Sequence, residues 1–182
     1  FLRKKDFSIY QQAFAIETNA TTGRVQVAST PTWSAERELS KQLAIKPDTS
    51  DRNIFVGVQR TRENPNPTGN TATMFTANSI EPALQDMLNR PSPSAAVDNL
   101  WQDRVNYLRG SNAKEGNPFR ARSRAMGDIV NSGVQYIGSP SATRALGVGY
   151  NQYVAANSSR TAAVYVGAND GMMHAFNAKT GR

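Results

Sequence analysis

The residues best equipped for chemistry lie near the end of the chain, in Asn169-Asp170-Gly171 and at His174. Asparagine and aspartate oxygens bind calcium, but a calcium loop needs oxygen ligands at alternate positions over about twelve residues. The residues that follow Gly171 supply none, since they include Met172, Met173, Ala175 and Phe176. We therefore predict that Asp170 and Gly171 form a tight turn in which the glycine adopts a positive φ.

The remaining reactive residue types are sparse. The chain has no cysteine and one histidine, which excludes disulfides and thiolate chemistry and argues against a histidine-based triad or metal site. The close carboxylate pairs, Glu36 with Glu38 and Asp48 with Asp51, lack an apolar pocket that would shift a pKa. The sequence therefore predicts no active site, no metal ligand and no cofactor in this chain.

A basic, aromatic stretch occupies the centre, with Arg104, Tyr107, Arg109 and Gly110 followed by residues 119–132. Residues 101–182 hold 10 of the 21 basic and 4 of the 14 acidic residues, a net +6 of the total +7. One interpretation is a nucleic-acid surface with rings stacked between arginines. The other interpretation is structural, with the arginines paired with Asp128 or bound to backbone groups. We favour the structural interpretation because the sequence has no known nucleic-acid motif.

Periodicity predicts the elements that hold these residues. A hairpin is expected over Phe7–Ala28, a helix over Ser34–Leu43 capped by Ser34 or Thr32, and a strand over Arg52–Val58. Residues 61–73 read as a mobile loop. A second helix is expected after a capping arrangement at Asn78–Glu81, with Pro82 in its first turn. A third runs from a Ser94 cap to Gly110, which follows its last apolar residue. A strand over 129–138, a loop over 139–159 and a hairpin over 162–176 complete the chain.

The final hairpin indicates a larger architecture. Val164 and Val166 alternate with Tyr165, and a second turn signal, Thr180-Gly181, follows about ten residues after the first. A single meander unit cannot bury both of its faces and needs neighbours. The chain begins at Phe1 and stops at Arg182, so we expect a piece of a longer protein. No apolar run approaches the roughly 18 residues of a membrane helix.

The order of the motifs resembles the type IV pilus tip-associated PilC/PilY family, in the region that enters its C-terminal β-propeller. The motifs are Arg104–Gly110, Gly127-Asp128-Ile-Val-Asn131-Ser132, Tyr136-Ile-Gly138 and Val164–Gly181. Weaker similarity covers Ile9–Phe14, Thr32–Ala35 and Arg52–Phe55. Asn177 departs from the family pattern, which commonly has aspartate there.

This resemblance implies a secreted, non-enzymatic protein at the pilus tip or bacterial outer surface, which assembles pili, restrains retraction and mediates adhesion. Its implied partners are minor pilins and a host or abiotic surface, without nucleic acid or a membrane span. Calcium is implied only for the full-length protein, on a later blade. Arg104, Tyr107, Arg109, Gly110, Asp128, Asn131, Asp170 and Gly171 are then structural motif residues.

The expected fold is mainly β with a few short helices, ending at the start of a quinoprotein-like β-propeller. The expected parts are residues 1–60 (hairpin, helix and strand), 61–93 (loop and short helix), 94–128 (helix and basic connector) and 129–182 (first propeller strands). The alternative is a fragment of a quinone-dependent dehydrogenase, which shares the final repeat. Residues 104–132 discriminate, since such enzymes are not expected to carry them.

Overall fold

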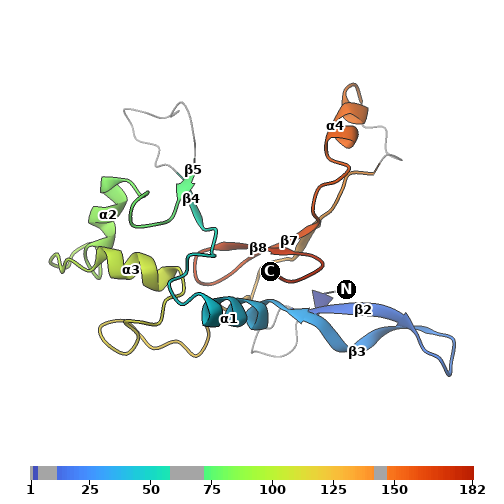
Figure 1. Ribbon diagram of the computed structural model, residues 1–182, viewed down its shortest axis with the longest axis horizontal. Coiled ribbons are helices and arrows are strands. Elements are labelled where there is room, and N and C mark those ends of the chain that lie inside the picture. The colour runs from blue at the N-terminus through green and yellow to red at the C-terminus, as the bar shows by residue number, and fades with distance from the viewer. Residues whose placement is uncertain (1, 4–11, 58–71, 142–146) are drawn as a thin grey trace. The chain divides into compact units, whose positions relative to one another are not determined.

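The computed structural model describes residues 2–3, 12–57, 72–141 and 147–182 (Figure 1). These residues form two compact units, one made of residues 1–40 with 124–182 and the other of residues 41–123. The described part is mainly β with a few short helices, and its strands form small antiparallel sheets, as expected. The four-part division expected from sequence stays a prediction.

The first sheet of the discontinuous unit is the expected hairpin. β1 (Leu2–Arg3), β2 (Gln12–Thr18) and β3 (Val25–Ser34) are antiparallel and lie in that order. The Asn19 side chain accepts hydrogen bonds from the backbone N–H groups of Thr21 and Thr22, both at 2.9 Å, which shapes the turn between β2 and β3. The start of the predicted hairpin, before Gln12, lies outside the described residues.

Helix α1 (Ala35–Ile45) follows β3 directly, with Glu36 and Glu38 in its first turn as predicted. The predicted serine cap is wrong, because the Ser34 hydroxyl is buried and makes no hydrogen bond within the described part of the chain. Ser34 is instead the last residue of β3. Its backbone is therefore extended by the ladder that pairs it with Gln12.

The second sheet of this unit has the order β6–β7–β8 and is antiparallel. Its strands are β6 (Gln135–Ile137), β7 (Ala163–Gly167) and β8 (Met173–Asn177). The predicted C-terminal hairpin is thus confirmed, with Val164 and Val166 buried. The strand predicted over 129–138 is shorter, because Asp128 uses its carbonyl to bind Asn169 N–H at 2.8 Å, outside any ladder.

The loop predicted over 139–159 contains a helix, α4 (Tyr150–Ala156). The Gly- and Ser-rich composition suggested a loop, but the start is set by Gly149, whose φ of +86° ends the preceding turn. Backbone groups one turn apart then form helical hydrogen bonds, such as that from Tyr153 N–H to the Gly149 carbonyl at 3.1 Å. None of the α4 residues is buried.

Trp33 links the two sheets of this unit. Its indole Nε1–H donates to the Ala178 carbonyl at 3.0 Å, and its ring lies 6.3 Å from that of Phe176. The ring covers Gly181, where an added Cβ would stand 2.6 Å from the indole. Gly181 also has a φ of +75°, so both the space and the backbone require glycine. The end of β3 is thereby packed on the turn after β8.

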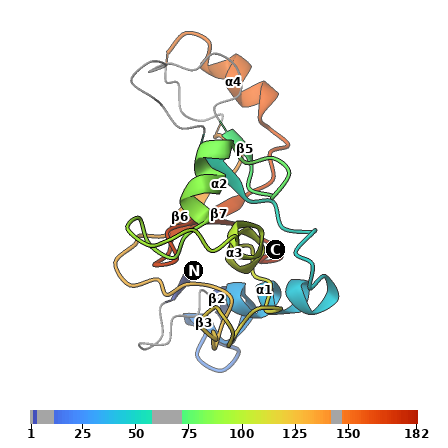
Figure 2. The same cartoon turned by 90° about the vertical axis from the view of Figure 1, so that its left-hand side faces the viewer.

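The other unit is built from β4 (Phe55–Gly57), β5 (Ala72–Met74), α2 (Pro82–Leu88) and α3 (Trp101–Leu108). Figures 1 and 2 show α2 and α3 side by side. Its core is Phe75, Ile80 and Val105, with apolar neighbours from β4 and its flank, from α2 and from α3. Pro82 occupies the first turn of α2 as predicted, but the residue before the helix is Glu81 and not Asn78, and its side chain makes no capping hydrogen bond.

Two expectations for this unit need correction. The mobile loop predicted over 61–73 lies largely outside the described residues, but its end belongs to β5, which pairs with β4. The third helix does not start at Ser94: it begins at Trp101, after Asp98 accepts a hydrogen bond from Leu100 N–H at 3.1 Å. Asn99 has a φ of +60°, which prevents a continuous helix through this point.

Candidate functional site

The C-terminal end of α3 is closed by Gly110, as the sequence predicted. Gly110 has a φ of +112° and donates to the Tyr107 carbonyl at 2.9 Å, while Ser111 donates to Asn106 at 2.9 Å. This pair of bonds is the Schellman arrangement, which satisfies carbonyls that the helix leaves unpaired. A Cβ on Gly110 would also meet Arg52 and Leu43 at 3.1 Å. Gly110 is therefore a structural residue.

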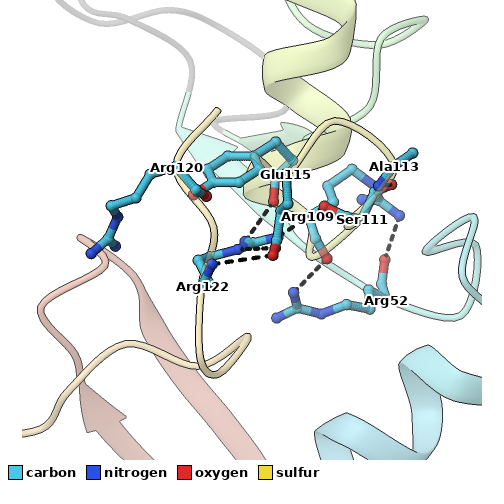
Figure 3. Close-up of polar contacts among 8 residues, drawn as sticks. Arg52, Arg109, Ser111, Ala113, Glu115, Arg120 and Arg122 are labelled. Atoms are coloured by element: carbon cyan, nitrogen blue, oxygen red, sulfur yellow. Dashed lines mark hydrogen bonds and ion pairs between the residues drawn. The ribbon is translucent and has the colours of Figure 1, made fainter. Parts of the chain in front are cut away.

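Arg109, immediately before that glycine, is a buried arginine that binds backbone oxygens. Its Nε donates to Thr49 Oγ1 at 3.1 Å and its Nη2 to the Thr49 carbonyl at 2.7 Å. The same guanidinium reaches the carbonyls of Phe75 and Arg52, both at 3.0 Å. Figure 3 shows that Arg109 and Arg52 each reach the backbone carbonyl of the other with their side chains. Burial lowers the pKa of Arg109, and Asp48 partly opposes the change.

Arg104, one turn earlier on α3, pairs with Asp98. Its two Nη atoms lie 2.7 and 2.5 Å from the two carboxylate oxygens, a bidentate pair, and Nη1 also donates to Leu88 C=O at 2.9 Å. The hydrogen bonds from Arg104 lower the pKa of Asp98 to about 2. The same pair raises the pKa of Arg104. The salt bridge ties the start of α3 to the segment before it.

Arg122 is the third arginine of this unit whose side chain binds several groups. It donates from its backbone N–H and its Nε to the two oxygens of Glu115, at 3.1 and 2.6 Å, and from its Nη atoms to the carbonyls of Tyr107 and Ser111, both at 2.8 Å. Its guanidinium carbon lies 3.9 Å from the centroid of the Tyr107 ring. Burial alone would raise the pKa of Glu115, but the Arg122 contacts lower it.

These contacts favour the structural interpretation of the basic centre. We call Arg104, Arg109 and Arg122 the arginine cluster, and each of its guanidiniums is bonded within the unit. Figure 3 shows the Arg120 side chain pointing away from Arg109 and Arg122. Arg120 is exposed, and its guanidinium makes no hydrogen bond or ion pair with a described residue. A nucleic-acid surface would need the arginines of the cluster to be available to phosphates.

Asp170 joins two of the sequence motifs in the discontinuous unit. One carboxylate oxygen accepts Gly127 N–H at 3.0 Å and lies 2.8 Å from His174 Nε2, and the other accepts Met172 N–H at 3.0 Å. Burial alone would raise the pKa of Asp170, but the hydrogen bond from His174 and the backbone donors lower it. We call this arrangement the Asp170 clamp. It holds residues 127–128 against the turn that starts β8.

The clamp requires glycine at position 127. A Cβ there would stand 2.6 Å from Asp170 N and 2.7 Å from its Cβ. Gly171 has a φ of +80° and donates to Ala168 C=O at 3.2 Å, as expected of a tight turn. Asp128 supplies its backbone carbonyl, whereas Asn131 is exposed and belongs to neither group of contacts.

Sequence reasoning missed several partners. It proposed Asp128 as a partner of the arginines, but Asp98 binds Arg104, and Thr49, Arg52 and Phe75 bind Arg109. Backbone carbonyls carry no sequence signal, so this set could not be read from residue types. The role of Asn177, in contrast, could be read from its residue type. Its side chain accepts hydrogen bonds from the N–H groups of Lys179 and Thr180, at 2.9 and 3.1 Å, and this role requires only an acceptor. Asparagine therefore serves there as aspartate would.

The described residues hold neither a cluster of metal ligands nor a helix that could span a membrane. No three side chains of histidine, cysteine, aspartate or glutamate in residues 2–3, 12–57, 72–141 and 147–182 gather as metal ligands would. Within the same ranges, no helix combines the length and apolar character needed to span a bilayer.

Comparisons with known proteins find relatives that are named type IV pilus biogenesis factors. The type IV pilus biogenesis factor PilY1 of Pseudomonas aeruginosa (strain PAK) is 32% identical over 184 residues, which cover 92% of this chain and 15% of that protein. The PilY1 homolog of Xylella fastidiosa (strain Temecula1) is 43% identical over 108 residues, which cover 54% of this chain and 9% of that protein. No family model and no solved structure matches the chain.

The match to the Pseudomonas protein covers 92% of the chain. The chain spans about 15% of the length of that relative. The resemblance predicted from the motifs is confirmed, and the chain belongs to the PilY1 family of type IV pilus biogenesis factors.

Proposed function

We propose that the chain is a non-enzymatic, structural part of a type IV pilus biogenesis factor. The single observation that carries this proposal is the alignment of PilY1 relatives with 92% of the chain. The geometry agrees, because the polar residues that could have served chemistry are bonded to backbone groups or to each other. Assembly of pili, restraint of retraction and adhesion are the activities proposed for the whole protein.

The β6–β7–β8 sheet is proposed as the first strands of a β-propeller blade. One face buries Val164 and Val166. The opposite face carries Ile137, Tyr165 and Met173, of which Ile137 is 43% and Met173 77% exposed. A sheet that is apolar on both faces is typical of a layer covered on both sides, as propeller blades are by their neighbours. The order of the strands leaves β8 at an edge, where a further strand can pair.

The location and partners follow from the same proposal. The protein acts at the pilus tip or on the bacterial outer surface, where it contacts minor pilins and a host or abiotic surface. The quinone-dependent dehydrogenase is not favoured, because the relatives that align through residues 104–132 carry pilus names. Calcium remains a proposal for the full-length protein alone.

A gene deletion in the bacterium that carries this protein tests the proposal. We expect loss of sheared surface pilin and of twitching motility, and recovery when the full gene is restored. A gene carrying Arg120→Ala should restore both, since the Arg120 guanidinium makes no hydrogen bond or ion pair with a described residue, and the backbone carbonyl that accepts the Tyr107 hydroxyl is kept. If the protein only restrains retraction, pili return in a deletion strain that cannot retract them. Normal piliation after deletion, with quinone reduction by the purified full-length protein, would support the dehydrogenase instead.

A further inference from the structure

The connection between β6 and β7, residues 138–162, is much longer than the pairing of these strands requires. Antiparallel neighbours are usually joined by about 2–5 residues, and long insertions in such connections are commonly functional. Figure 1 shows α4 at the end of this connection farthest from β6 and β7. Residues 139–162 contain no aspartate or glutamate. The connection therefore presents a surface without negative side chains.

Hydrogen bonds at its base hold the connection in place. Arg160 donates from Nε to the Gly138 carbonyl at 3.1 Å, and its Nη2 binds the same oxygen. Ser139 Oγ donates to Ser158 C=O at 2.9 Å. Arg160 also donates from Nη1 to the Tyr153 hydroxyl at 3.0 Å, which fixes α4 to the base. Since no residue of α4 is buried, these hydrogen bonds among the described residues position the helix.

The tip exposes apolar groups. Val148 stands between Gly147 and Gly149, whose φ angles of +105° and +86° turn the chain sharply on both sides. The relative exposure of Val148 is 110%, so no described residue covers it, and Tyr153 is 46% exposed. The rings of Tyr150 and Tyr153 stack with centroids 6.0 Å apart. The Tyr150 hydroxyl donates to Ser141 C=O at 3.1 Å.

We propose that this tip inserts into the interface of a lipid bilayer with anionic headgroups. Val148 would enter the acyl boundary, and the two tyrosines would lie at headgroup depth, where a ring with one polar end is favoured. The absence of acidic residues over 139–162, together with the charge of Arg160, avoids repulsion by anionic lipids.

The shape of the tip favours a membrane over a protein partner. A single valine projecting from a sharp turn is convex, and a fluid bilayer admits it without a matching groove. A second copy of the chain would need about 800 Å² of contact on each side, which one valine and two tyrosines do not offer. The proposal is independent of the role in pilus biogenesis.

Vesicle sedimentation of residues 1–182 tests it, with phosphatidylcholine vesicles with and without phosphatidylglycerol. We expect binding that is stronger with the anionic lipid. Val148→Asp should weaken it at least tenfold, the change that about 1.4 kcal/mol produces. The matched control is Val25→Asp, because Val25 is also an exposed valine, 74% exposed on β3. That variant should bind like the wild type.

A gain-of-signal variant gives a second readout. Val148→Trp should show blue-shifted emission, measured against the wild-type chain, only when anionic vesicles are added. Absence of vesicle binding at low salt would overturn the proposal. Equal losses in Val148→Asp and Val25→Asp would indicate general stickiness and would also overturn it. An unshifted Val148→Trp spectrum on bound vesicles, or binding to purified pilins but not to vesicles, would do the same.

Discussion

Removing the Arg109 side chain should unfold the unit formed by residues 41–123 more readily than any change to a surface arginine. Arg109 is 5% exposed and donates hydrogen bonds to Thr49, Phe75 and Arg52. Arg109→Ala leaves three backbone carbonyls without this donor, at about 1 kcal/mol or more each. Relief of the buried charge offsets part of the loss. We expect a net destabilisation of about 2–4 kcal/mol, a large share of the roughly 5–15 kcal/mol of a typical domain.

Urea unfolding followed by tryptophan fluorescence measures this effect within one unit. The chain has two tryptophans, and Trp101 packs on the core of the unit that contains Arg109. In a Trp33→Phe background, Trp101 is the sole reporter. Arg109→Lys should lie between wild type and Arg109→Ala, because a lysine ammonium cannot reproduce the planar fork of five donors.

Arg120→Ala is the matched control, since it also removes an arginine side chain but one whose guanidinium makes no hydrogen bond or ion pair with a described residue. Its unfolding free energy should stay within about 0.5 kcal/mol of wild type. An Arg109→Ala transition that coincides with that of Arg120→Ala would refute the assignment of Arg109 as the residue that joins Thr49, Phe75 and Arg52.

Two further predictions concern glycine and charge. Gly127→Ala should lower the free energy of unfolding in urea by about 1–3 kcal/mol, because the added Cβ would stand 2.6 Å from Asp170 N. The control Gly133→Ala, whose nearest atom lies at 3.9 Å, should lower it much less. Equal effects of the two substitutions would contradict the clamp. The pKa of Asp98 is lowered from 3.8 to about 2 by Arg104, so its contribution is present above pH 4 and lost as pH falls toward 2. Asp98→Asn should flatten the acid limb of a stability–pH curve, and an unchanged limb would count against the salt bridge.

Several elements could be predicted because their signals are local. The Gly110 stop of α3 and the Asp170-Gly171 turn each need a positive φ that glycine alone adopts at little cost. The alternation of Val164 and Val166 marks a strand with one buried face. The predicted start of α3 is wrong because the apolar spacing continues upstream of Trp101. The Asp98 side chain accepts the Leu100 N–H, and the helix begins only after it.

What the sequence by itself determined was the family, the final hairpin and the positive-φ glycines Gly110 and Gly171, since motif order and backbone conformation are properties of neighbouring residues. Only the tertiary structure decided which groups the arginines bind. Arg109 lies 60 residues from Thr49 along the chain, and the backbone oxygens that it reaches look alike in every sequence. The joining of Gly127 to Asp170 was likewise decided by packing, because a missing Cβ matters only once another backbone approaches it.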